Sequence, residues 1–470
     1  MVSQTCLGSF RMLGKWGLIR LAAVLFAAGL ISAILTFVLL RHGIVATSDS
    51  WAYWEGSVSI VERGTYSLLD GDKAGVRWWP PGFSIYLASV QAIFGTTGAS
   101  LVLAMCLLAF MNSVTWVAFS YSCFLAGEVS KSESARPALA FLLGTLFVVI
   151  FVALCSVDLY ANFLLLLLFG ILLNLLLRIP GTRSWHYGAL VVIISVTCCA
   201  ALLTHNSSVA FCSAAGLVLL CEPSRPFYQR LSACCVCVLA SVSFWVAVRI
   251  VLRQGSSHHF GTSAFSFPTY VYQSISGLGV FFLPFSFSFA SKAANLALGS
   301  VIALFSVWGA LAINDSTRYR ERIPFIVVCV YYLSLLLLFN VIWVSDPMSG
   351  RFLWLIPLGL LPAVCILVST KPAWCYLLLG LLLLGFPTFR FVRYARIGIT
   401  NTNWADPVLV IRPSFLLTTN SSSVSSRFVR IKPPAFPWQA RWADPDANKV
   451  SDEWLKVHQH FEPGTEPAHK

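Results

Sequence analysis

The sequence contains few charged residues for its length. Asp, Glu, Lys and Arg make up 11% of its 470 residues, against about 25% in an average soluble domain. A soluble globule of this length has too much surface to cover with so few charges. A hydrophobic content of 57% also excludes intrinsic disorder. The composition therefore predicts a polytopic membrane protein.

The sequence also lacks a Walker A motif and any Gly-rich phosphate loop, which argues against an ATP-driven pump. No pair of spans is interrupted by Gly or Pro as in inverted-repeat transporters. Cysteine is not scarce, but the fourteen cysteines lie almost entirely in apolar segments and in none of the predicted outer regions. We therefore expect them to be small packing residues rather than disulfides or metal ligands.

About eleven segments are apolar and long enough to cross a bilayer, which takes about 20 residues. The stretch from Phe83 to Phe94 is too short to span and predicts a helix in the interface, opened by Pro80-Pro81-Gly82. The predicted all-α bundle has spans at 21–40, 99–126, 137–157, 159–177, 188–204, 206–221, 231–248, 291–313, 324–344, 352–370 and 373–389.

The distribution of Lys and Arg predicts the orientation. With the N-terminus inside, the short cytoplasmic segments contain thirteen basic residues and the three short outer loops contain one. The same asymmetry explains the net charge of +13 without a nucleic-acid partner. The thirteen are Arg11, Lys15, Arg20, Lys131, Arg136, Arg178, Arg183, Arg225, Arg230, Arg318, Arg320, Arg322 and Lys371.

This orientation divides the chain into four parts. Residues 1–40 form the cytoplasmic N-terminus and a retained first span, and 41–98 form the first outer loop. Residues 99–389 form the transmembrane core, with a second outer loop at about 249–290. Residues 390–470 form a small extracytoplasmic cap, in which the alternation around Val408–Ile411 predicts a strand.

Two aspartates lie just outside predicted spans. Asp49 follows the first span at the start of a predicted helix, and Asp158 precedes the span at 159–177. Either carboxylate is explained by helix capping, because Asp accepts backbone N–H groups there and complements the helix dipole. A cap also holds a carboxylate in place, as a general base requires. The residues alone leave both interpretations open.

The first outer loop has an ordered series of short motifs. An acidic residue and a helix with aromatics, Ser48–Glu55, come first. Gly64-Thr65-Tyr66 follows, then the entry Pro80-Pro81-Gly82-Phe83, and an apolar run ends in Ile93-Phe94-Gly95. This loop resembles that of the GT-C glycosyltransferases, in particular family-39-like protein O-mannosyltransferases and lipid A aminoarabinose transferases.

Two later segments extend the resemblance over about residues 20–390. Ser156-Val157-Asp158-Leu159 matches the position of a second acidic residue, and Gly350–Pro357 resembles the motif that opens a late span. The sequence also departs from the family pattern. Ser50 follows Asp49 where many relatives have a second acidic residue. Trp79 stands where the aminoarabinose enzymes have Lys, which argues against that specific assignment.

The resemblance implies sugar transfer from a polyprenyl-phosphate donor on the outer side of the membrane. Asp49 would be the general base for an inverting displacement, assisted by Asp158. Arg351 and Arg77 would stabilise the phosphate leaving group, since Arg matches phosphate with two parallel hydrogen bonds. No cofactor or metal is expected. The acceptor would be a glycan, lipid or protein, and the location a bacterial inner membrane.

Four further residues are candidate substrate contacts. Tyr53, Trp54 and Trp79 are suited to stack on a sugar and equally to lie in an interfacial aromatic belt. His205 interrupts an apolar run, which fits a substrate contact or a structural turn. His258-His259 without a carboxylate at ligand spacing is a weak metal motif.

Two other functions are compatible with the same amino-acid composition. A transporter or flippase for a lipid-linked sugar would place ionisable residues inside the spans, whereas here they gather at the outer edge. A glycan polymerase or ligase of another fold would place its long outer loop late in the chain, whereas here it follows the first span.

Overall fold

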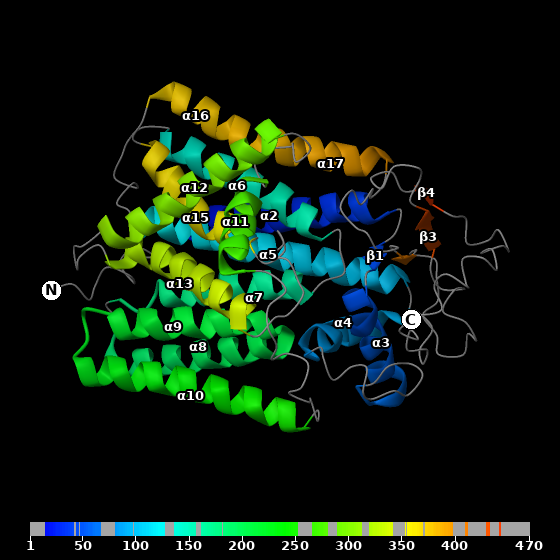
Figure 1. Ribbon diagram of the computed structural model, residues 1–470, viewed down its shortest axis with the longest axis horizontal. Helices are drawn as coiled ribbons and strands as arrows, with labels where there is room; N and C mark the ends of the chain where they lie inside the picture. Colours follow the sequence, from blue (N-terminus) through cyan, green and yellow to red (C-terminus); the bar gives the residue numbers. More distant parts are fainter. Residues whose placement is uncertain are drawn as a thin grey trace. The chain divides into compact units, whose positions relative to one another are not determined.

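The structure is a computed structural model of the chain (Figure 1). It divides into two compact units, each described by itself. Unit 1 comprises residues 1–32, 110–152 and 164–389, and unit 2 comprises 33–109, 153–163 and 390–470. The residues described are 15–41, 44–46, 48–66, 80–96, 98–126, 136–156, 161–180, 182–251, 266–280, 289–312, 319–341, 353, 355–369, 372–397, 409–411, 429–432 and 441–442.

Long apolar helices dominate the chain, which is a helical polytopic membrane protein. Eight are long and apolar enough to cross a bilayer, with mean hydropathy from 1.7 to 2.8. They are α2 (Lys15–Leu40), α5 (Gly98–Ala126), α6 (Arg136–Cys155), α8 (Ser184–Thr204), α10 (Phe227–Val251), α12 (Phe289–Ala312), α13 (Tyr319–Val341) and the continuous run of α16 (Ala373–Gly380), the π-helical turn η5 (Leu381–Gly385) and α17 (Phe386–Ile397).

Three shorter apolar helices occupy the remaining predicted spans: α7 (Ala161–Leu176), α9 (Val209–Cys221) and α15 (Leu355–Ser369). Each of the eleven predicted segments therefore contains a helix. Several boundaries differ by a few residues, and the largest difference is at the last helix, which continues past Phe389 to Ile397. A helix within the second outer loop, α11 (Phe267–Val280), was not predicted.

A cluster of aromatic rings forms the centre of unit 1. Phe169 of α7, Phe211 of α9 and Tyr331 of α13 lie within 4.6–5.6 Å of one another, centroid to centroid, and Trp116 of α5 lies 6.1 Å from Phe169. All four rings are fully buried. Because each ring comes from a different helix, contacts between the aromatic rings join four helices.

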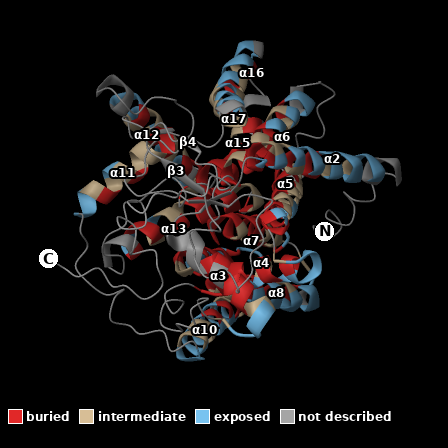
Figure 2. Ribbon diagram, turned by 90° about the vertical axis from the view of Figure 1, so that its right-hand side faces the viewer, coloured by how far each residue is buried: buried red, intermediate tan, exposed pale blue. Residues whose placement is uncertain are grey.

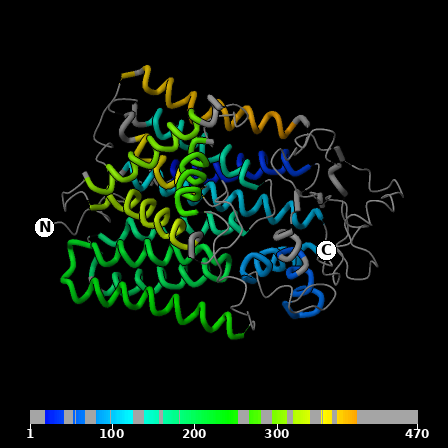
Figure 3. The backbone as a smooth tube through the Cα atoms, viewed as in Figure 1, coloured from blue at the N-terminus to red at the C-terminus, as the bar shows by residue number. Residues whose placement is uncertain are grey.

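The helices α8, α9 and α10 lie side by side (Figure 1), and each runs antiparallel to the one before it in the chain (Figure 3). Small thiols fill their interfaces: Cys198 of α8 and Cys237 of α10 have sulfur atoms 4.0 Å apart. Every cysteine in the described residues is free, in agreement with the predicted packing role.

The helices α11 and α12 approach each other at backbone distance. A Cβ at Gly279 of α11 would overlap the carbonyl of Asn295 in α12. A Cβ at Gly299 of α12 would overlap the carbonyl of Ile275 in α11. Glycine has no Cβ, and two glycines therefore permit this close approach of the helix backbones.

Unit 2 contains a helical hairpin and a small sheet. The helices are α3 (Ser48–Arg63) and α4 (Gly82–Phe94), and α4 confirms the short helix predicted over 83–94. The sheet has the antiparallel order β1 (Ile44–Ala46), β2 (Leu409–Ile411), β3 (Val429–Lys432) and β4 (Arg441–Trp442), with Val45 opposite Val410. The predicted strand at 408–411 is confirmed, but its pairing with the first outer loop was not predicted.

We expect Gly299→Ala to destabilise the protein by about 1–3 kcal/mol, because the added methyl meets a backbone carbonyl that has no side-chain freedom to relax. Thermal unfolding in detergent measures this. The control is Gly188→Ala, since nothing lies within 4 Å of a Cβ at Gly188. Equal melting temperatures for the two variants would contradict the close approach of α11 and α12.

Candidate active site

The candidate general base lies where the sheet of unit 2 leads into a helix. β1 ends at Ala46, and α3 begins at Ser48, so Asp49 occupies the first turn of α3. A carboxylate in a first turn faces the positive end of the helix dipole, which favours its ionised form. The backbone placement matches the helix start expected from the sequence.

The helix α3 is held against α4 by buried contacts. The Ser84 hydroxyl of α4 donates to the Tyr53 carbonyl of α3 at 2.8 Å. The Tyr53 and Phe83 rings meet edge to face, with centroids 5.4 Å apart. Figure 2 shows α3 as largely buried, and α4 buries the face that carries Phe83, Ser84 and Leu87. The segments that carry the aspartate motif and the Pro-Pro-Gly motif, about 30 residues apart in the sequence, therefore pack together.

The Gly-Thr-Tyr motif closes this hairpin. Gly64 has φ of 66°, a left-handed conformation that ends α3, and its N–H donates to the Ile60 carbonyl at 3.0 Å. The chain then returns so that the Tyr66 ring lies against Gly56, where a Cβ would overlap it. The Tyr66 hydroxyl hydrogen-bonds to the Ser84 hydroxyl, and burial raises the pKa of Tyr66, so this phenol stays neutral at physiological pH.

The same packing bears on two predicted substrate contacts. Tyr53 is 2% exposed and Trp54 is fully buried. The Tyr53 ring packs against Phe83 of α4, and contact of either residue with a sugar stays a prediction. The spacing of aromatic residues along a helix does not show whether their rings are exposed for stacking on a sugar or buried in a core. That depends on whether another element, here α4, covers the same face.

The C-terminal ends of α2 and α6 also meet in unit 2. The Ser156 hydroxyl, just past the end of α6, donates to the Thr36 hydroxyl of α2 at 3.2 Å, and both residues are fully buried. Asp158 itself lies outside the described residues. Two residues before it, however, the chain is joined to the helix that precedes Asp49.

Basic residues gather at the end of α2 and on α17, a feature not predicted from the sequence. An Arg41 Nη donates to the Ala395 carbonyl at 2.9 Å. An Arg390 Nη donates to the Tyr394 hydroxyl at 3.1 Å, and its guanidinium lies over the same ring. The sequence signal for this feature is the amphipathic stretch after Phe389, within the predicted cap at 390–470.

Other predicted site residues lie outside the described part of the chain: Arg77, Trp79, Arg351 and the pair His258-His259. Within the described part, no group of three or more His, Cys, Asp or Glu could hold a metal ion. His205 belongs to unit 1. Its Nδ1 accepts from the Ser207 N–H at 3.1 Å and so caps the short 3-10 turn Asn206–Ser208. This is the structural-turn interpretation; substrate contact by His205 stays a prediction.

We expect Ser84→Ala to loosen α3 from α4, because it removes the bond to the Tyr53 carbonyl and the Tyr66 hydroxyl loses a partner. The cost should be about 1–3 kcal/mol. Hydrogen exchange across residues 48–66 measures it. Ser89→Ala is the matched control, since the exposed Ser89 hydroxyl bonds only within its own helix, to the Ile85 carbonyl at 2.8 Å. Unchanged exchange in Ser84→Ala would refute this role.

Comparison with known proteins found little. No family model and no curated protein matches the chain. Among solved structures, it is similar to the crystal structure of ArnT from Cupriavidus metallidurans in the apo state. The identity is 14%, the alignment covers 78% of each chain, and the TM-score is 0.37. A TM-score this low carries no functional argument.

Proposed function

We propose that the protein is a membrane glycosyltransferase of the GT-C type. It transfers a sugar from a polyprenyl-phosphate donor to a glycan, lipid or protein acceptor at the outer face of the membrane. Asp49 is the general base and Asp158 assists it. The N-terminus lies in the cytoplasm and the C-terminus outside. The resemblance of the first outer loop to that family motivates this proposal.

One observation carries the proposal most directly. The helix that begins with the Asp49 motif is packed at several points: β1 precedes it, Gly64 ends it, and the Ser84 hydroxyl of α4 donates to its Tyr53 carbonyl. Acid–base catalysis depends on a carboxylate kept within hydrogen-bonding reach of the proton it takes. The aspartate, Gly-Thr-Tyr and Pro-Pro-Gly motifs, which resemble the family pattern, thus all belong to one packed hairpin that starts near the proposed base, Asp49.

The reaction assigned to these residues is a single displacement. Asp49 accepts the proton of an acceptor hydroxyl or amine as that atom attacks the anomeric carbon. The bond from that carbon to the lipid-phosphate oxygen breaks, and the configuration inverts. The released phosphate gains negative charge, which Arg351 and Arg77 stabilise. Arg41 and Arg390 add positive charge within the same structural unit as Asp49.

The distribution of ionisable residues supports an enzyme over a transporter. In the eight described spans, Asp, Glu, Lys and Arg stand only near the helix ends, as Arg230 and Arg249 do in α10. A carrier that moved a phosphorylated sugar lipid through the bilayer would need polar or charged partners along its path.

We expect Asp49→Asn to lower the transfer rate by about 10²–10⁴-fold, the usual contribution of a general base. The purified protein is supplied with radiolabelled mannose, glucose, arabinose or galactose on polyprenyl phosphate, and transfer or slow hydrolysis of the sugar is counted. The matched control is Glu62→Gln at the other end of α3, an exposed carboxylate with a bond of 3.4 Å from Thr96.

The outcomes test the enzyme class and the catalytic role of Asp49 separately. Turnover by the wild type and by Glu62→Gln, but not by Asp49→Asn, supports both the class and the base. Equal turnover in all three proteins keeps the class and removes Asp49 from catalysis. No turnover with any donor, in a folded protein given its membrane extract as acceptor, contradicts the enzyme proposal.

A further inference from the structure

Four polar residues at one end of α8, α9 and α10 form what we call the α9–α10 cluster. Tyr187 lies in the first turn of α8, Glu222 and Arg225 lie in the turn between α9 and α10, and Arg230 lies in the first turn of α10. All belong to unit 1. The Arg225 guanidinium lies over the Tyr187 ring, 4.8 Å from its centroid. Glu222, Arg225 and Arg230 all act electrostatically on the Tyr187 hydroxyl. The cluster has no part in the proposed transfer reaction.

Neutral groups contact Arg230 and Glu222 of this cluster. An Arg230 Nη donates to the Leu220 carbonyl at 3.3 Å, and its guanidinium lies 5.7 Å from the Phe227 centroid. Glu222 accepts from the backbone N–H of Ser224 at 3.0 Å and from the Ser224 hydroxyl. The positive charge of Arg230 is therefore fixed in position by a carbonyl and a ring, neither of which neutralises it.

Three buried polar atoms in the cluster have no hydrogen-bond partner within the described part of the chain. They are the Tyr187 hydroxyl, the Arg230 Nε and one carboxylate oxygen of Glu222. The Tyr187 side chain is 7% exposed and Glu222 is fully buried. Buried polar groups are normally paired. Two donors and one acceptor call for a ligand that has both acceptor oxygens and a hydrogen-bond donor.

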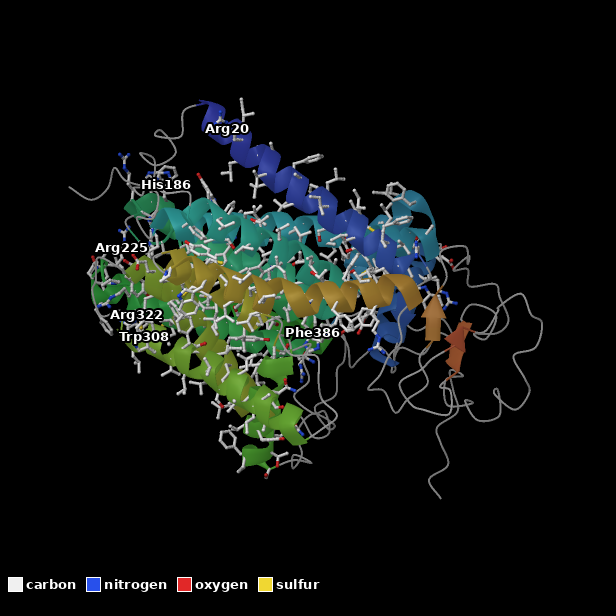
Figure 4. All side chains as sticks on the ribbon, turned by 90° about the horizontal axis from the view of Figure 1, so that it is seen from above. Arg20, His186, Arg225, Trp308, Arg322 and Phe386 are labelled. Carbon is white, nitrogen blue, oxygen red and sulfur yellow. The ribbon has the colours of Figure 1, made fainter. Side chains whose placement is uncertain are left out.

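Exposed aromatic rings place this cluster at the level of lipid headgroups. Trp185 is 72% exposed, Phe227 62% and Tyr228 66%, and all three lie next to cluster residues in the sequence. Such rings prefer the membrane interface. Figure 4 places Arg225 and Arg322 at one end of the helices, together with the exposed Trp308.

The charge at this end selects an anionic ligand. Among the described residues, six arginines and two glutamates lie at the ends of α7 and α9 and at the starts of α8, α10 and α13. Basic pockets between transmembrane helices bind anionic headgroups. The arginines are Arg178, Arg183, Arg225, Arg230, Arg320 and Arg322, and the glutamates are Glu222 and Glu321.

We propose that the α9–α10 cluster binds an anionic glycerophospholipid with a hydroxylated headgroup, of the phosphatidylglycerol class. Its phosphodiester oxygens accept from Arg225, Arg230 and the Tyr187 hydroxyl. A headgroup hydroxyl donates to Glu222. The acyl chains lie along the exposed apolar side chains of α10, such as Leu231 and Val238.

Native mass spectrometry of the full-length protein in detergent tests this with phosphatidylglycerol, phosphatidylethanolamine and phosphatidylcholine at equal concentration. We expect phosphatidylglycerol to bind about tenfold or more tightly than phosphatidylcholine, and the double variant Arg225→Gln/Arg230→Gln to lose that preference. The control is Arg249→Gln at the opposite end of α10, where the guanidinium lies 4.2 Å from the Trp245 centroid.

A second variant keeps the test valid if the double variant melts early in lipid-free detergent. Tyr187→Phe retains the ring beneath Arg225 and removes only the unpaired hydroxyl, and it should weaken phosphatidylglycerol several-fold with an unchanged melting temperature. Equal binding of all three lipids, preference for phosphatidylethanolamine, or an equal loss in Arg249→Gln would overturn the proposal. Displacement of the lipid by equimolar soluble glycerol phosphate would also overturn it, because the site would then recognise free phosphate.

Discussion

The absence of water in the hydrocarbon core is the constraint on which this structure depends. Backbone N–H and C=O groups buried in lipid must pair within their own segment, so the apolar stretches form helices. The same constraint keeps charged side chains near helix ends, where they reach the interface. Arg230 and Arg249 mark the two ends of α10 in this way. Chemistry on a charged or polar substrate is therefore confined to the ends of the bundle.

Close packing between the helices depends on the positions of glycines, which have no side chain. Gly279 and Gly299 bring α11 and α12 to backbone distance, and Gly56 accepts the Tyr66 ring against α3. Apolar residues alone do not select one helix partner over another, because lipid is as apolar as they are. Shape and the buried hydroxyl of Ser84 supply the specificity, and they do so in the hairpin that carries Asp49.

The two candidate sites differ in how their charges are arranged. In unit 2, the proposed base begins a helix held by a hairpin, and arginines from α2 and α17 belong to the same unit. In unit 1, the α9–α10 cluster combines fixed arginines with a buried carboxylate and exposed aromatic rings. One arrangement suits catalysis on a phosphorylated lipid, and the other suits retention of a structural lipid.

The sequence by itself determined the class, the helix positions and the short helix over 83–94, because hydropathy, span length and breaker residues are local properties. It also singled out Asp49 at a helix start. Only the tertiary structure decided that Tyr53 and Trp54 are core residues, that β1 pairs with β2 of the distant tail, and that Arg41 reaches the carbonyl of Ala395. The last two contacts join segments hundreds of residues apart, and no local pattern encodes which face of a helix another segment will cover.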